Sequence, residues 1–195
     1  MISGYAIKDL EQIRALNSAV RSEIIDIVEL SGVSTIKQIS ALIGRSPHSL
    51  YFHVKILVTV GLLIETGVIK NGKQKEIQYD VPDRPMNLTY DLTIPDMNSA
   101  VQGVVDGILS MISRDFKKAL EAKAIQKFDM RHNVMHTRAI SWLSAEQVQE
   151  LQRTMYDTIS SFKSEGENKN LQKKNLYALS VHLVPLSNQK KKYLL

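Results

Sequence analysis

The stretch GRSPHSLYFHVKILVTVGLL, residues 44–63, decides the fold because it holds a whole helix together with the signals for both of its ends. Ser46 followed by Pro47 is typical of a helix start, since the serine side chain can accept a hydrogen bond from the first turn and proline lacks the amide proton that would go unpaired there. Gly61 favours the backbone conformation that ends many helices. The sequence therefore predicts a helix between Ser46 and Gly61.

The two sides of this helix differ in character. At about 100° per residue, Leu50, Val54 and Leu57 fall on one side and form a stripe suited to a core. The opposite side carries His48, Phe52, Lys55 and Thr59. Because aromatic side chains are buried in most globular proteins, Phe52 and the flanking Tyr51 raise the question of what this side contacts.

Three further helices are expected before this stretch. Apolar residues recur at helical spacing over residues 7–17 and again over residues 19–31. Thr35 and Gln38 have the form of a capping box, which opens a third helix that Gly44 closes.

Two runs rich in β-branched and aromatic residues, LLIETGVIK and KEIQYDV, follow the Ser46 helix and flank Asn71-Gly72. An Asn-Gly pair between two such runs is a strong signal for a tight hairpin. Three helices, a short turn, a fourth helix and a hairpin follow one another in the order of a winged helix-turn-helix.

The sequence changes character after Pro82. Residues 83–96 contain Pro85 and Pro95 and predict a connector. A long helix is expected from Met97 to Phe128, with apolar positions spaced for one buried stripe. These positions are Val101, Val105, Ile108, Ile112, Phe116 and Leu120.

Beyond that helix, residues 134–143 are expected to be extended. Ser144 and Gln147 repeat the capping-box pattern and predict a helix to about Lys163. The run LYALSVHLVPL, residues 176–186, resembles a strand.

The fold class expected from these signals is an α-rich α+β protein. An N-terminal winged helix-turn-helix over residues 1–82 and the connector precede residues 97–195, which form a helical C-terminal region with a small strand pair. This region would serve dimerisation and could also bind an effector.

The composition is that of an ordinary globular protein, with 44% hydrophobic and 23% charged residues among 195. There is no cysteine, which excludes disulfides and thiolate metal or redox sites. No apolar run reaches the roughly 18 residues needed to cross a bilayer, and the N-terminus does not have the pattern of a signal peptide. We therefore expect a cytoplasmic protein without a membrane contact.

Positive charge is concentrated in one part of the chain. The formal net charge is +5, and residues 32–75 account for all of it, with six basic residues against Glu65. The basic residues are Lys37, Arg45, Lys55, Lys70, Lys73 and Lys75. A segment of this kind is expected of a surface that binds phosphate groups, although a solvated basic face is a common alternative.

Two segments carry a family resemblance, namely ALNSAVRSEIIDIVELSG and TIKQISALIGRSPHSLYFHVKILVTVGLLIETG. The residues that carry the resemblance are, in chain order, Arg21, Gly44, Ser46, Leu50, His53, Lys55, Leu57, Gly61 and Leu62. With these features residues 8–82 resemble an ArsR-type winged helix-turn-helix transcriptional regulator, and the remainder resembles the helical extension of longer members. The resemblance implies a homodimer that binds double-stranded DNA at a palindromic operator, usually as a repressor.

On this resemblance, the side of the Ser46 helix opposite Leu50 faces the major groove of DNA. The candidates for contacts with base edges are His48, Ser49, Tyr51 and Phe52. The candidates for contacts with phosphate are Arg45, Ser46, Lys55, Lys70, Lys73 and Lys75. The alternative for the two aromatics is packing against a neighbouring domain or subunit. His53 flanks the apolar stripe, so we expect a hydrogen-bonded structural histidine there.

The seam of the dimer is expected on the helix that begins at Met97, because a winged helix of about 75 residues cannot bury so long a helix by itself. The seam residues are Val101, Val105, Ile108, Ile112 and Phe116. The alternative is burial of part of this stripe against the Ser144 helix of the same chain.

Other functions find less support in the sequence. No catalytic signature or glycine-rich phosphate loop is present, so we expect neither an enzyme nor a cofactor. His132 and His136 have the spacing of half a helical metal site, but no third ligand lies nearby, and no metal is expected. Trp142, Tyr156, Phe162 and Tyr177 could line an effector pocket, although core packing is the commoner fate of such residues. The remaining alternatives are a winged helix that binds only proteins and a small-molecule-binding protein without a DNA function.

Overall fold

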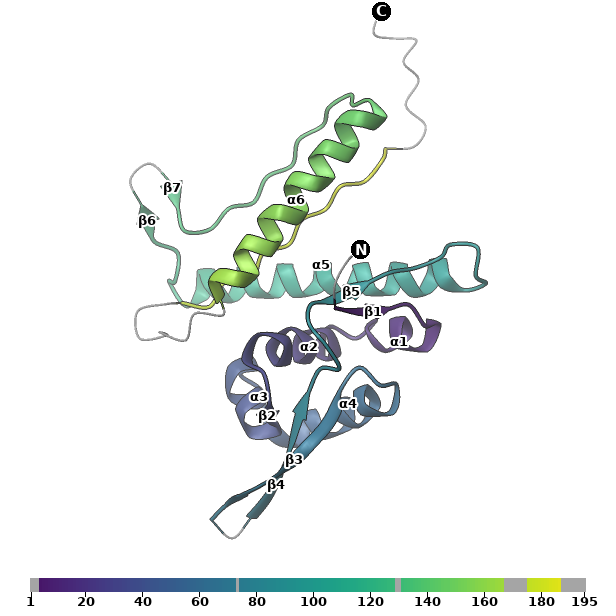
Figure 1. The fold of residues 1–195 in the computed structure, drawn as a ribbon. Coiled ribbons are helices and arrows are strands. Elements are labelled where there is room, and N and C mark those ends of the chain that lie inside the picture. The colour runs from purple at the N-terminus through teal and green to yellow at the C-terminus, as the bar shows by residue number, and fades with distance from the viewer. Residues whose placement is uncertain (1–3, 73, 129–130, 167–174, 187–195) are drawn as a thin grey trace, which may run out of the picture. The chain divides into compact units, whose positions relative to one another are not determined.

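The structure of the chain, a computed structural model, describes residues 4–72, 74–128, 131–166 and 175–186 (Figure 1). The chain divides into two compact units, Met1–Met135 and His136–Leu195. The first unit includes the long helix that begins at Met97, which the sequence analysis placed in the C-terminal region. No helix among the described residues is both long enough and apolar enough to span a membrane.

Four helices of the first unit lie in the predicted order, but the first is shorter than the predicted residues 7–17, because Ile7 belongs to a strand. They are α1 (Leu10–Ala15), α2 (Ala19–Ser31), α3 (Ile36–Ile43) and α4 (Pro47–Thr59). Their apolar stripes meet in one core, because each helix has to remove one face from water. The most enclosed core side chains include Ile13, Ile24, Ile39, Leu50 and Leu57.

The predicted caps set the ends of α3 and α4. Thr35 donates its backbone N–H to Oε1 of Gln38 over 2.8 Å, and its Oγ1 accepts from the Gln38 N–H over 3.4 Å. Gly44 ends α3 with a φ of +72°, a left-handed conformation that glycine adopts without strain. Ser46 caps α4 by accepting from the Ser49 N–H over 3.4 Å. The capping predictions are therefore confirmed.

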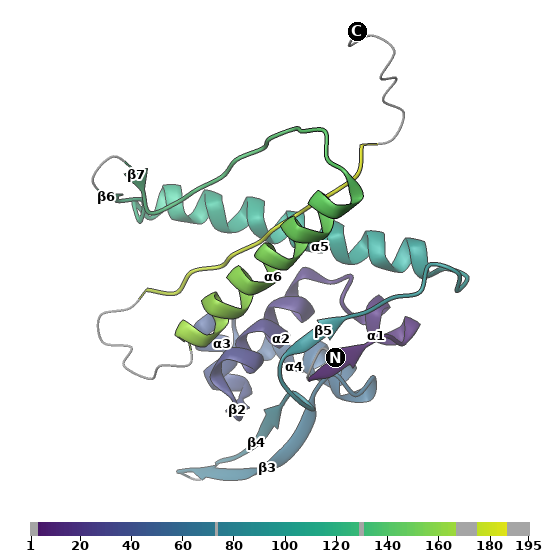
Figure 2. The same ribbon diagram turned by 45° about the horizontal axis from the view of Figure 1, so that its top comes forward.

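The predicted hairpin is present as β3 (Ile64–Asn71) and β4 (Gln74–Asp80), which pair in antiparallel fashion. The short β2 (Ser34–Thr35) adds to β4, so the sheet has the order β2-β4-β3. Figures 1 and 2 both show the far end of the hairpin projecting away from the helices of the first unit. Lys70 and Lys75 stand directly opposite each other near this end.

A second, parallel pair joins β1 (Tyr5–Ile7) to β5 (Met86–Leu88). Neither strand was predicted: β5 lies in the expected connector, and Ile7 of β1 was expected to begin a helix. Three-residue strands are too short to show a period, so their existence depends on the partner that the fold supplies.

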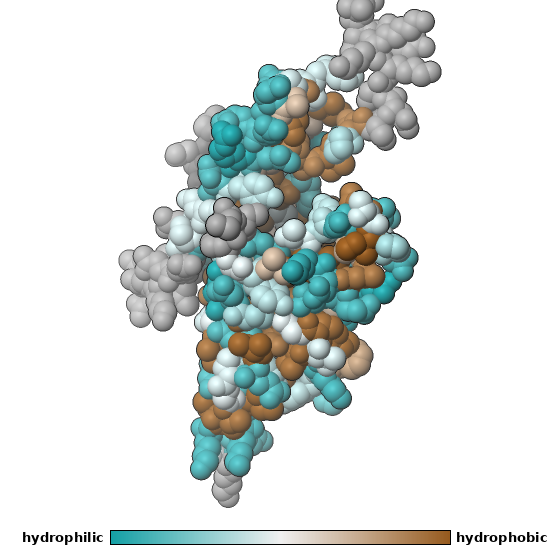
Figure 3. Space-filling view, turned by 45° about the vertical axis from the view of Figure 1, so that its right-hand side comes forward, coloured by the Kyte–Doolittle hydropathy of each residue, from teal (hydrophilic) through white to brown (hydrophobic). Residues whose placement is uncertain are grey.

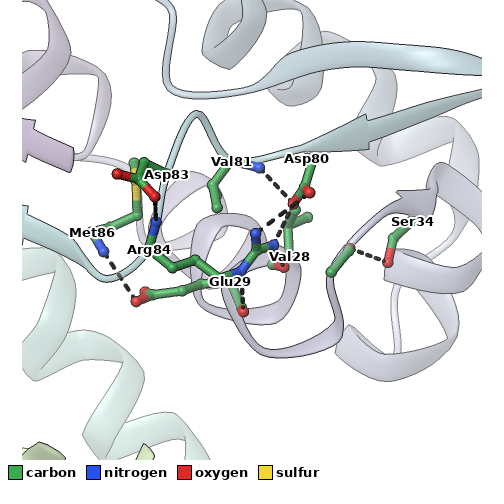
Figure 4. A network of polar contacts seen from close by, with 9 residues as sticks. Val28, Glu29, Ser34, Asp80, Val81, Asp83, Arg84 and Met86 are labelled. Atoms are coloured by element: carbon green, nitrogen blue, oxygen red, sulfur yellow. Dashed lines mark hydrogen bonds and ion pairs between the residues drawn. The ribbon is translucent and has the colours of Figure 1, made fainter. Parts of the chain in front are cut away.

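Arg84, in the segment after the hairpin, forms hydrogen bonds with the C-terminal end of α2 (Figure 4). Its Nε donates to the Glu29 carbonyl over 2.9 Å and its Nη2 to the Val28 carbonyl over 3.0 Å, while Asp80 forms an ion pair with the same guanidinium. Glu29 in turn accepts from the Met86 N–H over 3.1 Å. The carbonyls at a helix C-terminus carry partial negative charge, so a cation there stabilises α2 and holds the base of the hairpin.

The long helix α5 spans Met97–Glu121, and the prediction that it reaches Phe128 is wrong. It packs against α1 and α2 in the first unit. Its buried face differs from the predicted stripe. The buried residues are Met97, Ala100, Val104 and Gly107.

Small residues explain which face of α5 is buried. A Cβ atom added to Gly103 would lie 2.5 Å from the Asn17 side chain, and one added to Gly107 would lie 3.4 Å from the Asn17 carbonyl oxygen. The glycines thus let α5 approach the loop between α1 and α2 closely. The predicted stripe of larger side chains overlaps this face only in part, because Val101 and Ile108 pack partly against the core whereas Val105 and Ile112 are 40% and 37% exposed. The single buried stripe that the sequence predicts is therefore divided into a packed and an exposed part.

The second unit contains α6 (Ala145–Gly166), whose start is the predicted capping box. Ser144 donates its N–H to Oε1 of Gln147 over 2.9 Å and accepts in return from the Gln147 N–H over 3.3 Å. No strand occurs over the described residues 175–186, so the strand prediction there is wrong. Residues 134–143, which were expected to be extended, belong to no helix or strand. A strand forms only where a ladder partner is available, and residues rich in β-branched side chains do not supply one by themselves.

A small strand pair does occur after Met97, but at other residues. It joins β6 (Lys127–Phe128) to β7 (Arg131–His132) and belongs to the first unit.

Candidate nucleic-acid interface

The helix α4 divides into a buried and an exposed side, as its sequence predicts. Leu50, Val54 and Leu57 are fully enclosed in the core. Tyr51 and Phe52 are 60% and 68% exposed. His48, Ser49, Lys55 and Thr59 are exposed on the same outward side. The buried stripe therefore holds α4 as a rigid support for side chains that face away from the protein.

The turn before α4 is held by hydrogen bonds to its backbone. Ser40 donates its hydroxyl to the Arg45 carbonyl over 2.6 Å, and the Arg45 N–H donates to the Ser40 carbonyl over 3.2 Å. The hydroxyl of Ser49 donates to the Ser46 carbonyl over 2.7 Å. Because the hydroxyl proton is already donated to this carbonyl, Ser49 could contact a base edge only as a hydrogen-bond acceptor. The sequence alone did not show this limit.

Three of the lysines predicted to bind phosphate are exposed to solvent. Lys55 lies on α4, and Lys70 and Lys75 lie on the hairpin strands. None of these three side chains forms a hydrogen bond or an ion pair with another described residue. Lys73, which the sequence analysis placed with them, lies outside the described residues.

Lys37 differs from these lysines because the fold neutralises it. Its Nζ lies 2.6 Å from a carboxylate oxygen of Glu76 and 3.2 Å from the Gln74 side-chain oxygen. The positive charge counted over residues 32–75 is therefore not all available to a ligand, since the acidic partner stands one residue beyond that segment.

The outward side of α4 also carries apolar surface. A shallow depression of about 230 Å³ is lined by Phe52, Lys55, Ile56, Thr59 and Val60. On the hairpin, Ile64, Val68, Ile69 and Ile77 are exposed. Figure 3 shows hydrophobic surface over the stem of the hairpin, with hydrophilic side chains at its tip. The candidate interface therefore combines cationic side chains with apolar contact area.

His53 is half-buried beside the core stripe, as predicted, but its hydrogen bonding differs from the prediction. Its Nδ1 is buried and has no hydrogen-bond partner among the described residues. Its ring packs edge-to-face on Phe52, with centroids 5.8 Å apart. Burial lowers the pKa of His53, and the positive charges of Arg21 and Arg45 lower it further.

This pKa shift predicts an acid-dependent loss of stability. In the unfolded chain His53 returns to an ordinary pKa of about 6.5, so below that pH the unfolded chain binds more protons than the folded chain. The free energy of unfolding should therefore fall as the pH drops below about 6.5. Urea unfolding at about pH 7.5 and about pH 5.5 should show a smaller loss for His53→Gln than for the wild type. Equal losses would show that another group carries the pH dependence.

The structure adds two residues that the sequence analysis missed, Glu23 on α2 and Arg114 on α5. Arg114 donates to both carboxylate oxygens of Glu23, over 2.8 and 3.1 Å. Arg45 lies against the same carboxylate, with its Nε 3.7 Å from Oε2. Burial alone would lower the pKa of Arg114, but hydrogen bonds to Asp115 and Glu23 raise it above its ordinary value. Glu23 and Arg114 are 91 positions apart, so no local pattern could reveal this contact.

The predicted dimer seam is divided between two environments. Val101 and Ile108 pack partly against the core of the first unit. Val105 and Ile112 are exposed, and Phe116 is half-buried. The exposed members leave part of the seam available to a partner.

Nothing in the described residues groups three or more His, Cys, Asp or Glu side chains around a potential metal position. His132 ends β7 and His136 lies in a segment without helix, so their spacing does not place them on one helical face. The candidate effector-pocket residues are all exposed. They are Trp142, Tyr156, Phe162 and Tyr177.

In comparisons with known proteins, no family model matches the chain, and no curated protein matches it.

Proposed function

We propose that the chain is a winged helix-turn-helix transcriptional regulator that binds double-stranded DNA sequence-specifically as a homodimer, with repression as its mode of action. One observation carries this proposal. The outward side of α4 presents the exposed His48 and Lys55, which have no hydrogen bond or ion pair with another described residue, above a fully buried stripe, and the adjoining hairpin presents Lys70 opposite Lys75. The proposal needs no catalytic step or cofactor, and the regulator would act in the cytoplasm.

The dimensions of α4 suit the major groove. Its 13 residues give a length of about 20 Å, and the groove, about 12 Å wide, admits one α-helix. Side chains in the first turns of such a helix reach base edges. His48 and Tyr51 stand in those turns, and Phe52 could contact thymine methyl groups with its exposed ring.

The cationic side chains would position the protein on the sugar-phosphate backbone. Lys55 lies on α4, and the hairpin lysines lie on strands that project from the helices, so they could reach separate phosphates. Such contacts carry no sequence information, but they add salt-dependent affinity because each one releases counterions from the DNA.

The exposed apolar part of α5 supports the homodimer in this proposal. Val105, Leu109 and Ile112 fall on one side of the helix and are all more than a third exposed. Two copies that cover this surface would also present two α4 helices to a palindromic site, which increases affinity by linking the two binding events.

The decisive experiment is selection of bound sequences from a random pool of double-stranded DNA by the full chain. We expect enrichment of a palindrome, because two symmetry-related copies read two half-sites. Recovery of sequences no different from the starting pool would contradict sequence-specific binding.

At the selected site, His48→Ala should cost about 1–3 kcal/mol of binding free energy and much less on random DNA, because a base contact is lost. Lys75→Ala is the matched control, since loss of a phosphate contact should weaken binding to both DNAs equally and reduce the salt slope by about 1. Fluorescence anisotropy over a range of salt concentrations measures both quantities. Equal losses on both DNAs for His48→Ala would exclude this residue from base reading.

The apolar depression on α4 favours a second candidate function, a winged helix that docks a protein partner. Phe52, Ile56 and Val60 line it, and such side chains are typical of protein interfaces. On this alternative, Phe52→Ala would abolish capture of the partner, and the random DNA pool would show no enrichment.

A further inference from the structure

The carboxylate of Glu23 stands between cations from two other elements of the first unit. Arg114 of α5 donates to both of its oxygens, over 2.8 and 3.1 Å. Arg45, in the turn between α3 and α4, approaches Oε2 with its Nε at 3.7 Å. One acidic side chain on α2 therefore connects α5 with the turn that leads into α4.

The two contacts differ in strength. The pair with Arg114 is bidentate and charge-assisted, which is the strong form of this interaction. The 3.7 Å separation from Arg45 is beyond hydrogen-bond distance, so only electrostatic attraction acts there. The Glu23 side chain is 16% exposed and that of Arg45 is 37% exposed, so the donors of Arg45 can still reach a ligand in solvent.

Only the side chain of Arg45, and not its backbone, is free to move when the contact between Glu23 and Arg114 changes. Its carbonyl accepts from the Ser40 hydroxyl and its N–H donates to the Ser40 carbonyl, which holds the backbone of the turn. The guanidinium can therefore either turn toward the carboxylate on α2 or reach outward to an anion beside α4.

We propose that Glu23 is a positioning residue for Arg45, and that Arg114 sets how strongly Glu23 holds it. While Arg114 occupies both carboxylate oxygens, Arg45 is free to bind a DNA phosphate. When α5 withdraws Arg114, the largely buried carboxylate loses two hydrogen bonds and recruits Arg45, because an unpaired buried charge is costly. The position of α5 thereby regulates DNA binding. This inference rests on the proposed function, since it takes the ligand of Arg45 to be a DNA phosphate.

The test in DNA binding uses three single variants and their combinations in the full chain. Arg114→Gln should weaken binding to the selected DNA about fivefold to tenfold and lower the salt slope by about 1, because one phosphate contact is lost. Adding Glu23→Gln should restore the affinity, since the competing charge is gone. In an Arg45→Gln background, Arg114→Gln should have no further effect.

A merely structural role of the ion pair gives the opposite pattern. Either substitution would then break the same pair, so the double variant would bind DNA no better than Arg114→Gln alone, and Arg114→Gln would weaken binding equally in the Arg45→Gln background; either result overturns the proposal. Arg114→Lys retains the charge but not the bidentate geometry, so an intermediate loss is expected. Thermal unfolding of each variant checks that it is folded.

A measurement without DNA separates this inference from the proposed function. Solvent exchange of the Arg45 Nε–H, followed by NMR in the free protein, should slow in Arg114→Gln, where Glu23 takes up Arg45. It should accelerate in Glu23→Gln. Unchanged exchange in both variants would overturn the role of Glu23. The expected exchange pattern, in a chain that selects no DNA sequence, would refute the proposed function and leave the competition for Arg45 intact.

Discussion

Replacement of both Val105 and Ile112 by aspartate is expected to convert the homodimer into monomers and to weaken binding to a palindromic site by about 100-fold or more. Both side chains are exposed on α5, so the added charges should not disturb the core of a single chain. In a dimer they would be buried without partners, which is strongly unfavourable. Ile108 is less suitable for this test because it packs partly against the core.

The matched control is a variant with Ser99→Asp and Ser110→Asp. These serines are exposed on another side of α5, so the same charge is added outside the seam. Sedimentation velocity should show dimers for the control and monomers for the seam variant, with equal thermal stability of the first unit. A seam variant that remains dimeric would move the interface to another surface, such as the N-terminal helix around Leu10.

Leu57→Ala should reduce the free energy of unfolding by about 2–5 kcal/mol, which is the usual cost of truncating a large buried aliphatic side chain. Leu57 is fully enclosed, and its carbonyl accepts from the Leu62 and Leu63 N–H groups where α4 leads into the hairpin. The variant should therefore loosen both the support of α4 and the base of the hairpin. Urea unfolding monitored by circular dichroism measures the loss.

Phe52→Ala on the same helix is the control for this prediction. Because Phe52 is largely exposed, its removal should change the free energy of unfolding by about 0.5 kcal/mol or less. The two variants therefore separate the buried from the outward side of α4. A large loss for Phe52→Ala would mean that its ring is covered in solution, by a second copy or by another part of the chain.

Features that depend on neighbouring residues were predictable from the sequence. The capping boxes at Thr35 and Ser144, the end of α3 at Gly44 and the hairpin after α4 are all present. Each rests on a hydrogen bond or a backbone conformation within a few residues, so the residue types concerned are sufficient to indicate it. The exposed side of α4 was predictable for the same reason, because the spacing of apolar residues within one helix shows which side is buried.

Features that depend on distant residues were not predictable in this way. The apolar pattern of α5 pointed to its large side chains, whereas the packed face is built on Gly103 and Gly107, where the loop containing Asn17 comes close. Residues 176–186 resemble a strand, but none is formed there among the described residues, because a strand requires a partner that composition does not supply.

By itself, the sequence determined the order of the helices, the capped starts of α3, α4 and α6, the end of α3 at Gly44, the hairpin, and the set of basic residues around α4. Only the tertiary structure decided which charges remain available, because that depends on which side chains meet. Lys37 is neutralised by Glu76 on the hairpin, and Arg45 faces a carboxylate of Glu23 that Arg114 already occupies. These contacts join residues on different elements, and ion pairs of this kind leave no trace in local spacing.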